Sequence, residues 1–503
     1  MTGSERTSVR TELARDGFGE IGQADQLLTE LSDGLGITRQ EILVGADAAA
    51  DPDAALAALA RIARRDAAAV SAAVRRVGPT LWLLLGASNG FADFYLRHPA
   101  ELAELTASDG RLPTGDELVA DLLESVGADA EGFAGTGDES AWVALRVRYR
   151  RVLARIAAFD LSAPDPVEVL PAVAAALADA AGAALEASLA VARTRVAGGG
   201  VGAGLFPRDQ VAGTELAIIG MGKTGARELN YVSDVDVIFV GGASGDLLEE
   251  VGESRVIDIA TRLAVQTMRG ISGMEIEPPL WEVDANLRPE GKQGALVRSL
   301  ESHLSYYDRW AKSWEFQALL KARPLAGDRM LGEAYVAAVQ PKVWTSAARE
   351  NFVDSVQRMR ERVTEHIPAA DVPYQLKLGP GGIRDIEFTV QLLQLVHGLA
   401  DDRIRQRGTL DALDALVTEG YIGRHDAAAF ARDYRRLRVL EHRVQLRQLR
   451  RTHLMPQTPE GLRVLARASH LAPDSGAIWD VWEGIKREVR EIHVRLFYRP
   501  LLS

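Results

Sequence analysis

The chain has 503 residues, 47% of them hydrophobic and 25% charged, a composition typical of a globular protein that is too long for one small core. Its net charge of −12 argues against broad attraction to nucleic acid or to an anionic membrane, and the absence of cysteine excludes disulfides, thiolate metal sites and cysteine nucleophiles. No apolar run approaches the ~20 residues that span a bilayer and the start is polar, so a cytoplasmic protein is expected.

Residues 1–197 are predicted to form a helical region. Apolar residues recur at helical spacing, as in 52–62, where Asp51 is placed to cap the helix N-terminus. A further helix is predicted over 145–161, with arginines around an apolar stripe. These arginines have two interpretations, a solvated basic face or a surface for a phosphate or a partner, and the sequence leaves both open. They are Arg146, Arg148, Arg150, Arg151 and Arg155.

The glycine-rich segment Gly198–Gly204 is predicted to be a flexible joint after this helical region. The pattern then changes to β-type segments at residues 215–220, 234–240 and 280–284, with a helix at 248–268. This alternation predicts an α/β core over 206–327, and helical periodicity predicts a C-terminal helical bundle over 328–503. The expected fold is therefore mostly α with a central α/β domain built on a small mixed β-sheet.

The stretch from Ile218 to Val240 carries the strongest functional signal and reads as strand, glycine turn, short helix and strand. Gly220–Gly225 matches the G-x-G-x-x-G dinucleotide fingerprint, but the helix after it is too short for a Rossmann crossover. A P-loop is excluded because Ala217 stands where its upstream glycine belongs. What remains is a turn whose backbone N–H groups can approach a phosphate closely.

Two acids follow this turn on the next strand. Asp234 and Asp236 are two residues apart and therefore share one face of the strand. Buried together they repel each other and lose hydration, and a cation between them relieves both costs. Asp284 is the candidate third carboxylate, because Trp281 and Val283 would face the core on the opposite side; its alternative role is to cap the following turn. Such a carboxylate set can hold two cations that bridge a reacting phosphate.

Basic residues further along are candidates for binding phosphate oxygens. They are Arg288, Lys292, Lys321 and Arg323. Lys292 and Lys321 have surface charge as the alternative interpretation. A second glycine-rich turn, Lys377–Phe388, opens a helix predicted to run to His397. It is either a plain N-terminal turn, with Asp385 and Glu387 favouring the helix dipole, or an anion-binding surface that includes Lys377.

Together these residues resemble the bifunctional glutamine synthetase adenylyltransferase/adenylyl-removing enzymes, which belong to the polymerase β-like nucleotidyltransferases. The resemblance rests on the string Gly-Met-Gly-Lys-x-Gly-x-x-Glu-Leu-Asn-Tyr-x-Ser-Asp-x-Asp, the turn Arg288–Gly291, the segment Trp314–Arg323 and the turn Lys377–Glu387, and it covers the chain from about Leu81. Lys223 departs from the superfamily pattern, in which a small residue usually follows the glycine.

That family carries two homologous catalytic halves, and the chain resembles one of them. The half that attaches AMP usually has Gly-Arg-x-Gly-Gly before its aspartates, whereas this sequence has Gly-Lys-Thr-Gly-Ala at residues 222–226. This version is similar to the first, AMP-removing half. The chain also ends about where the family passes into its second half, so an adenylyl-removing half is expected.

The resemblance implies that inorganic phosphate attacks the phosphodiester joining AMP to a tyrosine of adenylylated glutamine synthetase, giving ADP and unmodified synthetase. Asp234, Asp236 and Asp284 would be catalytic and would hold Mg²⁺. Gly222 and Ser233 would position the α-phosphate, and Arg288 would neutralise phosphate charge. No general base is required, because phosphate is already an anion. The full expected nucleotide- and phosphate-binding set is Gly222, Lys223, Ser233, Arg288, Lys321, Arg323 and Lys377.

Three other functions compete with this one. They are ATP-dependent attachment of AMP to the same tyrosine, nucleotidyl transfer to the PII signal protein, and a catalytically silent nucleotide sensor. The PII alternative arises because Lys377–Asp385 also resembles a segment of PII uridylyltransferases; retention of all three carboxylates argues against the silent sensor. The expected partners are adenylylated glutamine synthetase, ADP or ATP and phosphate, with PII and a second adenylyltransferase half as further candidates, and neither nucleic acid nor membrane.

Overall fold

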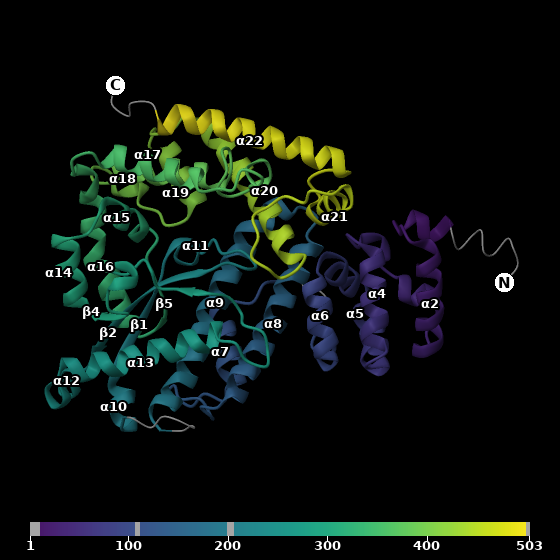
Figure 1. The fold of residues 1–503 in the computed structure, drawn as a ribbon, viewed down its shortest axis with the longest axis horizontal. Helices are drawn as coiled ribbons and strands as arrows, with labels where there is room; N and C mark the ends of the chain where they lie inside the picture. Colours follow the sequence, from purple (N-terminus) through teal and green to yellow (C-terminus); the bar gives the residue numbers. More distant parts are fainter. Residues whose placement is uncertain (1–10, 106–110, 199–205, 499–503) are drawn as a thin grey trace, which may run out of the picture.

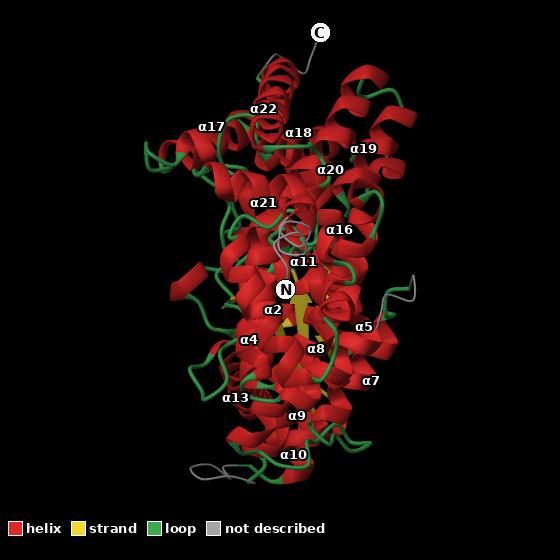
Figure 2. Ribbon diagram, turned by 90° about the vertical axis from the view of Figure 1, so that its right-hand side faces the viewer, coloured by secondary structure: helices red, strands yellow, loops and turns green. Residues whose placement is uncertain are grey.

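The computed structural model describes residues 11–105, 111–198 and 206–498. In these ranges helices predominate and surround one small mixed sheet of five strands, which lies near the middle of the molecule (Figures 1 and 2). The predicted fold class is confirmed. The predicted domain boundaries stay a prediction, and most of the expected joint Gly198–Gly204 lies outside the described residues.

Most of the helices before the sheet have an N-terminus that is capped by a side chain. Asp51 accepts a hydrogen bond from the Ala54 N–H at 3.0 Å and so caps α4, as predicted. The alanine-rich α9 packs against α7, α8 and α13 and is buried on most sides, which small residues permit. The elements are α2 (Ile21–Leu35), α3 (Arg39–Leu43), α4 (Pro52–Ala63), α5 (Ala67–Ala87), α6 (Asn89–Arg97), α7 (Gly115–Ser125), α8 (Glu139–Ser162), α9 (Pro166–Val196) and α10 (Arg208–Gly213).

The sheet has the order β3-β2-β1-β5, with β4 also paired to β2. β1 pairs antiparallel with β2 and β5, whereas β3 and β4 run parallel to β2. β1 and β2 match the predicted strands, β3 is shorter than expected, and β4 and β5 were not predicted. The strands are β1 (Thr214–Gly220), β2 (Val235–Ala243), β3 (Val283–Asp284), β4 (Val297–Ser299) and β5 (Arg323–Gly327).

Of the helices that follow β1 along the chain, the earlier ones pack against the sheet and the later ones form the C-terminal bundle. α22 lies across the outer face of this bundle (Figure 1). The single helix predicted over 248–268 is two, because the chain breaks at Gly252 with φ +80°. The helices are α11 (Gly222–Gly225), α12 (Gly245–Val251), α13 (Glu253–Ser272), α14 (Leu300–Arg309), α15 (Ser313–Leu319), α16 (Arg329–Thr345), α17 (Phe352–Glu365), α18 (Ile383–His397), α19 (Thr409–Thr418), α20 (Arg424–Leu446), α21 (Pro459–Ser469) and α22 (Ser475–Phe497).

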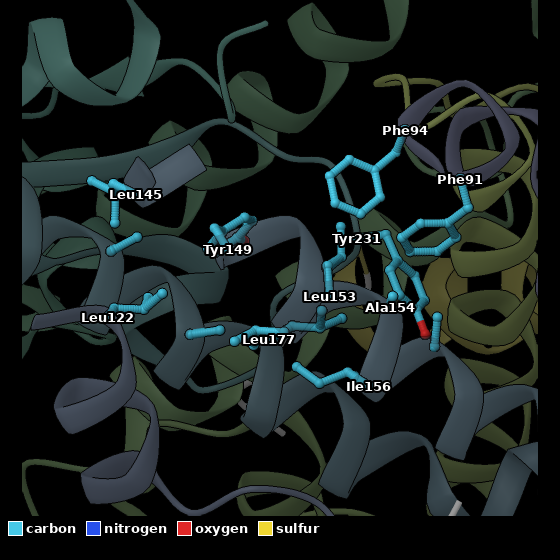
Figure 3. Close-up of a cluster of buried hydrophobic side chains, with 14 of the residues drawn as sticks. Phe91, Phe94, Leu122, Leu145, Tyr149, Leu153, Ala154, Ile156, Leu177 and Tyr231 are labelled. Carbon is cyan, nitrogen blue, oxygen red and sulfur yellow. The ribbon is translucent and has the colours of Figure 1, made fainter. Parts of the chain in front are cut away.

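One hydrophobic cluster joins the N-terminal helices to the chain segment that follows the glycine turn. Tyr231 lies in it beside Leu153 and Ala154 of α8 (Figure 3). Its hydroxyl donates to Asp160 at 2.9 Å, and Asp160 is ion-paired with Arg443 of α20. The segment between the turn and the strand acids is therefore anchored on two sides.

The arginines of α8 bind the protein's own elements, which neither interpretation from the sequence expected. Arg146 is fully buried and donates to the carbonyls of Gly270 at 2.8 Å, Glu277 at 2.7 Å and Gly273 at 2.9 Å, which tie α8 to the end of α13 and the loop after it. Arg148 pairs with an aspartate of α7, Arg150 donates to two proline carbonyls, and Arg151 pairs with a glutamate.

Two helices, α5 and α9, are long and apolar enough to cross a membrane by length and composition alone, which differs from the expectation from the sequence. Within their most apolar windows, 56% of α5 and 61% of α9 is buried inside the protein. Core helices pass the same test, so this is weak support for a membrane span.

Candidate functional site

The glycine turn between β1 and β2 is shaped around Asp236. Gly222 has φ +52°, and a Cβ at this position would lie 2.9 Å from Asp236 Oδ2. The Met221 N–H donates to the Asp236 carbonyl at 2.9 Å. Gly222 is therefore required both by its backbone conformation and by the space that the carboxylate occupies.

Asp236 and Asp284 lie opposite each other, because β2 and β3 pair in parallel register at this position. Burial raises the pKa of Asp236 to about 6, and the charge of Asp284 adds to the rise. Trp281 and Val283 are buried on the other face, as predicted. Asp284 Oδ1 also accepts a hydrogen bond from the Asn286 N–H at 2.7 Å, so the turn-capping role is real and leaves its second oxygen available.

The third acid, Asp234, is ion-paired with Arg451 of the loop after α20. In the part of the chain that the structure describes, no group of three or more acids, histidines or cysteines is arranged to hold a metal ion. The metal-binding role of the three aspartates stays a prediction. Their chemistry fits a hard divalent cation, since all three offer carboxylate oxygens and Asp236 lies against a like charge.

A cavity of about 320 Å³ opens in front of this turn. Seven of the ten predicted site residues line it: Gly222, Lys223, Ser233, Asp234, Asp236, Lys321 and Lys377. The opposite wall comes from helices far along the chain and includes Trp314, Gln317, Met359, Arg384, Glu387, Phe388 and Gln391. The structure thus gathers segments more than 150 residues apart around the strand acids.

Two of the three lysines of the cavity, Lys223 and Lys321, are buried and paired with acids, whereas Lys377 is half-buried. Lys223 Nζ lies 2.9 Å from Glu441 Oε2 of α20, and Lys321 Nζ lies 3.0 Å from Glu228 Oε2. Burial lowers the pKa of Lys223 to about 7, with the positive charge of Arg438 contributing and Glu441 opposing. Burial also lowers the pKa of Lys377. The surface-charge interpretation of Lys321 is wrong, since only 6% of this residue is exposed.

Three predicted residues do not line the cavity. Asp284 lies opposite Asp236 on the neighbouring strand β3 but is not part of the cavity wall. The Arg288 guanidinium donates to the Ala285 carbonyl at 2.8 Å and so holds the loop after Asp284. The Arg323 guanidinium donates to the Thr224 carbonyl at 3.0 Å and braces the glycine turn from the side away from the cavity. The phosphate-binding roles of the two arginines stay predictions.

Sequence reasoning predicted no site role for Arg384 and Glu441, and for Glu387 only an effect on the helix dipole. Burial alone would raise the pKa of Glu387, but Arg384 and the cavity lysines lower it to about 2. Arg384 Nη1 lies 2.9 Å from Glu387 Oε2. Asp385, by contrast, is buried against Arg360 of α17 at 2.6 Å, so the pair Asp385 and Glu387 does not act simply on the helix dipole. Glu441 could have been noticed in the sequence because it lies on the apolar face of the α20 helix, where a charged side chain needs a buried partner.

Comparisons with known proteins address the identity of this site. A family model described as glutamate-ammonia ligase adenylyltransferase matches residues 79–338, just over half of the chain. The chain belongs to this family. Its members are nucleotidyltransferases, and the matched residues include the glycine turn and all three aspartates. The recognised resemblance is confirmed.

The relatives are about twice as long as this chain. Proteins named bifunctional glutamine synthetase adenylyltransferase/adenylyl-removing enzyme are 59% identical over 495 residues in Leifsonia xyli, 46% over 516 in Streptomyces coelicolor and 44% over 507 in Mycobacterium tuberculosis. These matches cover 98%, 100% and 96% of this chain but 49%, 48% and 48% of the relatives. The chain therefore spans about half the length of the curated relatives it matches.

A second family model, described as GlnD PII-uridylyltransferase, matches residues 350–497. That range holds α17 to α22, including Arg384, Glu387 and Glu441, but none of the strand acids. The match is a likeness of the C-terminal helices.

Proposed function

We propose that this chain removes AMP from adenylylated glutamine synthetase by phosphorolysis. The observation that carries the proposal is the meeting of carboxylates and cationic side chains in one cavity. Asp234, Asp236 and Lys223 stand on the side of the glycine turn, and Lys377 and Arg384 approach from the opposite wall. A phosphodiester with an incoming phosphate needs both, cation-holding carboxylates and cationic side chains for the phosphate oxygens.

In the proposed reaction an oxygen of inorganic phosphate attacks the α-phosphorus of the AMP group. The bond from that phosphorus to the tyrosine oxygen breaks, the proton of the attacking hydrogen phosphate passes to the tyrosine oxygen, and ADP leaves. Mg²⁺ held by Asp234, Asp236 and Asp284 would neutralise charge that develops on the phosphates. Arg384 and the lysines orient the phosphate oxygens, and Gly222 lets the backbone approach them without a side chain in the way.

The direction of transfer rests on the turn at residues 222–226, which resembles the AMP-removing half. Among the residues that the structure describes, none of those lining the cavity is a histidine. This suits a nucleophile that is already an anion at neutral pH. ATP-dependent attachment of AMP, in which a tyrosine hydroxyl must lose its proton, is the second candidate.

The test supplies the chain with adenylylated glutamine synthetase, Mg²⁺ and phosphate and measures ADP. A parallel reaction with unmodified synthetase and ATP measures pyrophosphate. Formation of ADP supports the proposal; pyrophosphate without ADP reverses the direction, and neither product from folded protein refutes it. Asp236→Asn should abolish turnover, whereas Glu282→Gln, which removes an exposed acid from the neighbouring segment, should not.

The same proposal sets the partners. The chain would act in the cytoplasm, would contact adenylylated glutamine synthetase, and would work beside a second adenylyltransferase half, since it spans about half of its relatives. PII remains a candidate regulator because of the likeness over residues 350–497.

A further inference from the structure

A second cavity, of about 340 Å³, lies on the other side of the glycine turn. Its wall includes Gly225 and Ala226, whereas Gly222 and Lys223 of the same turn line the first cavity. Four arginines from three separate segments line it: Arg227, Arg323, Arg405 and Arg407. In a chain of net charge −12 this is a pronounced local excess of positive charge.

The nearby acids do not balance these arginines. Asp179 of α9 serves both Arg227, at 3.1 Å from Oδ1 to Nε, and Arg323, at 3.9 Å. Asp411 is the one acid among the lining residues. Four guanidinium groups thus face two carboxylates, an excess of two positive charges. Burial lowers the pKa of Arg323, and the charges of Arg227 and Arg407 contribute, as expected for like charges held together.

Two of the arginines are free to take a ligand. Arg407 is exposed and has no hydrogen-bond or ion-pair partner among residues 11–105, 111–198 and 206–498. Arg405 uses one N–H for the Gly398 carbonyl at 2.8 Å, and its guanidinium lies over the Trp344 ring at 5.2 Å from the centroid. The stacking fixes the plane of Arg405, and its other N–H groups have no acceptor within the described part of the chain.

We propose that this cavity is a second anion site that binds a small dianion. The ligand chemistry is a pair of charged oxygens, supplied either by a dicarboxylate or by phosphate, because guanidinium groups bind both in the same bidentate manner. The excess of two positive charges matches a charge of about −2, and the cavity volume suits a small molecule.

The occupant of this site is coupled to the first cavity through short contacts. Thr409, two residues after Arg407, donates its N–H to Glu228 at 2.6 Å, and its hydroxyl contacts Lys321 Nζ at 3.1 Å. Arg323 holds the Thr224 carbonyl of the turn. An anion that draws in Arg405 and Arg407 therefore acts on the segment that positions Lys321. This coupling rests on the proposed function, whereas anion binding does not.

Binding is tested with Trp344 as the reporter, in a Trp314→Phe background that removes the tryptophan of the first cavity. Succinate and inorganic phosphate are titrated separately at constant ionic strength, and tryptophan fluorescence is followed. A saturable change with either probe is expected, and the probe that binds identifies the class. Arg407→Gln should weaken binding about tenfold or more, since it removes charge-assisted hydrogen bonds. Arg329→Gln, which removes an exposed arginine elsewhere, is the matched control and should leave affinity unchanged.

Two results would overturn the anion site: no saturable change with either probe, or equal affinity in Arg407→Gln and the parent protein. Hydrogen exchange tests the coupling without any turnover. Amides of residues 222–228 and 405–409 should exchange more slowly when the probe is bound, and Arg407→Gln should lose this protection. Protection of residues 405–409 alone would contradict the coupling while leaving the anion site standing, and neither result depends on the direction of AMP transfer.

Discussion

Replacing Glu441 by glutamine should destabilise the protein strongly. Glu441 is fully buried, with Lys223 Nζ at 2.9 Å from its Oε2, Arg438 Nε at 3.1 Å and His453 Nδ1 at 3.1 Å from its Oε1. Burial alone would raise the pKa of Glu441, but these neighbours hold it well below its usual value, so the side chain is an anion. Removing that anion leaves buried cations without a partner, which costs about 3–5 kcal/mol.

The loss should depend on pH in a defined direction. Lys223 has a pKa of about 7 in the folded protein, below its value in the unfolded chain, and Glu441 is one of the groups that keep it from falling further. In Glu441→Gln the folded-state pKa of Lys223 drops. Just below pH 7, Lys223 is therefore protonated in the folded parent protein but largely neutral in the folded variant. The stability difference between parent and variant should grow as the pH falls through 7 and shrink above it.

Urea unfolding at pH 6 and pH 8.5 measures both effects. The matched control is Lys223→Met in the Glu441→Gln background, which removes the unpaired cation and should restore part of the lost stability. A loss below about 1 kcal/mol would refute the buried ion pair, because that is the worth of an exposed pair. If the stability loss of Glu441→Gln is the same at both pH values, the titration of Lys223 does not contribute to it.

Three further predictions concern the turn, the acids and the anchor. Gly222→Ala should cost roughly 1–3 kcal/mol of stability and most of the AMP-transfer rate, because the alanine would have to adopt φ +52° with its Cβ 2.9 Å from Asp236 Oδ2. Gly484→Ala, at a helical position with open space around it, is the control. Equal melting temperatures of the two variants would contradict the reasoning. Mg²⁺ should raise the melting temperature of the parent protein but not of Asp236→Asn, since the ion relieves the repulsion with Asp284, and chelation should stop ADP formation; equal shifts would argue against this site. Tyr231→Phe should lower the unfolding free energy by about 1–3 kcal/mol by leaving Asp160 short of a donor, as urea unfolding would measure, and an unchanged midpoint would make that hydrogen bond unimportant.

The parts of the fold with a strong local pattern were predictable. β1 and β2 each contain a continuous apolar run, Leu216–Ile219 and Val237–Val240, and the alternation around Trp281 and Val283 correctly placed Asp284 on the opposite face. β5 was missed because it holds Pro324 and is only half-buried along its length, so it lacks both a clean alternation and an apolar run. The break at Gly252 was missed because glycine in a helical pattern does not itself end a helix.

Only one wall of the cavity was predictable, the one formed by the glycine turn and the start of β2. The turn and the strand acids are close in sequence, and their spacing alone brings them together. The opposite wall comes from α15, α17 and α18, with Glu441 of α20 behind it, and no local pattern reports contacts over such separations. Arg288 and Arg323 show that contacts of single side chains were equally out of reach of the sequence. Each is a buried or half-buried arginine near the site, but backbone carbonyls of the loops beside them take up their donors.

Lys223 shows how a departure from a family pattern is accommodated. The superfamily usually has a small residue after the glycine, and a lysine there must be buried at the base of the cavity, where its charge needs a partner. The partner is Glu441, 218 positions further along. A lysine paired in this way can have a structural role, in which its ion pair links the turn to the C-terminal bundle, or it can be a ligand for phosphate. The two roles differ in their consequences: the structural role predicts that Lys223→Met and Glu441→Gln are strongly coupled in stability, whereas a phosphate ligand predicts that Lys223→Met raises the KM for phosphate with little change in stability.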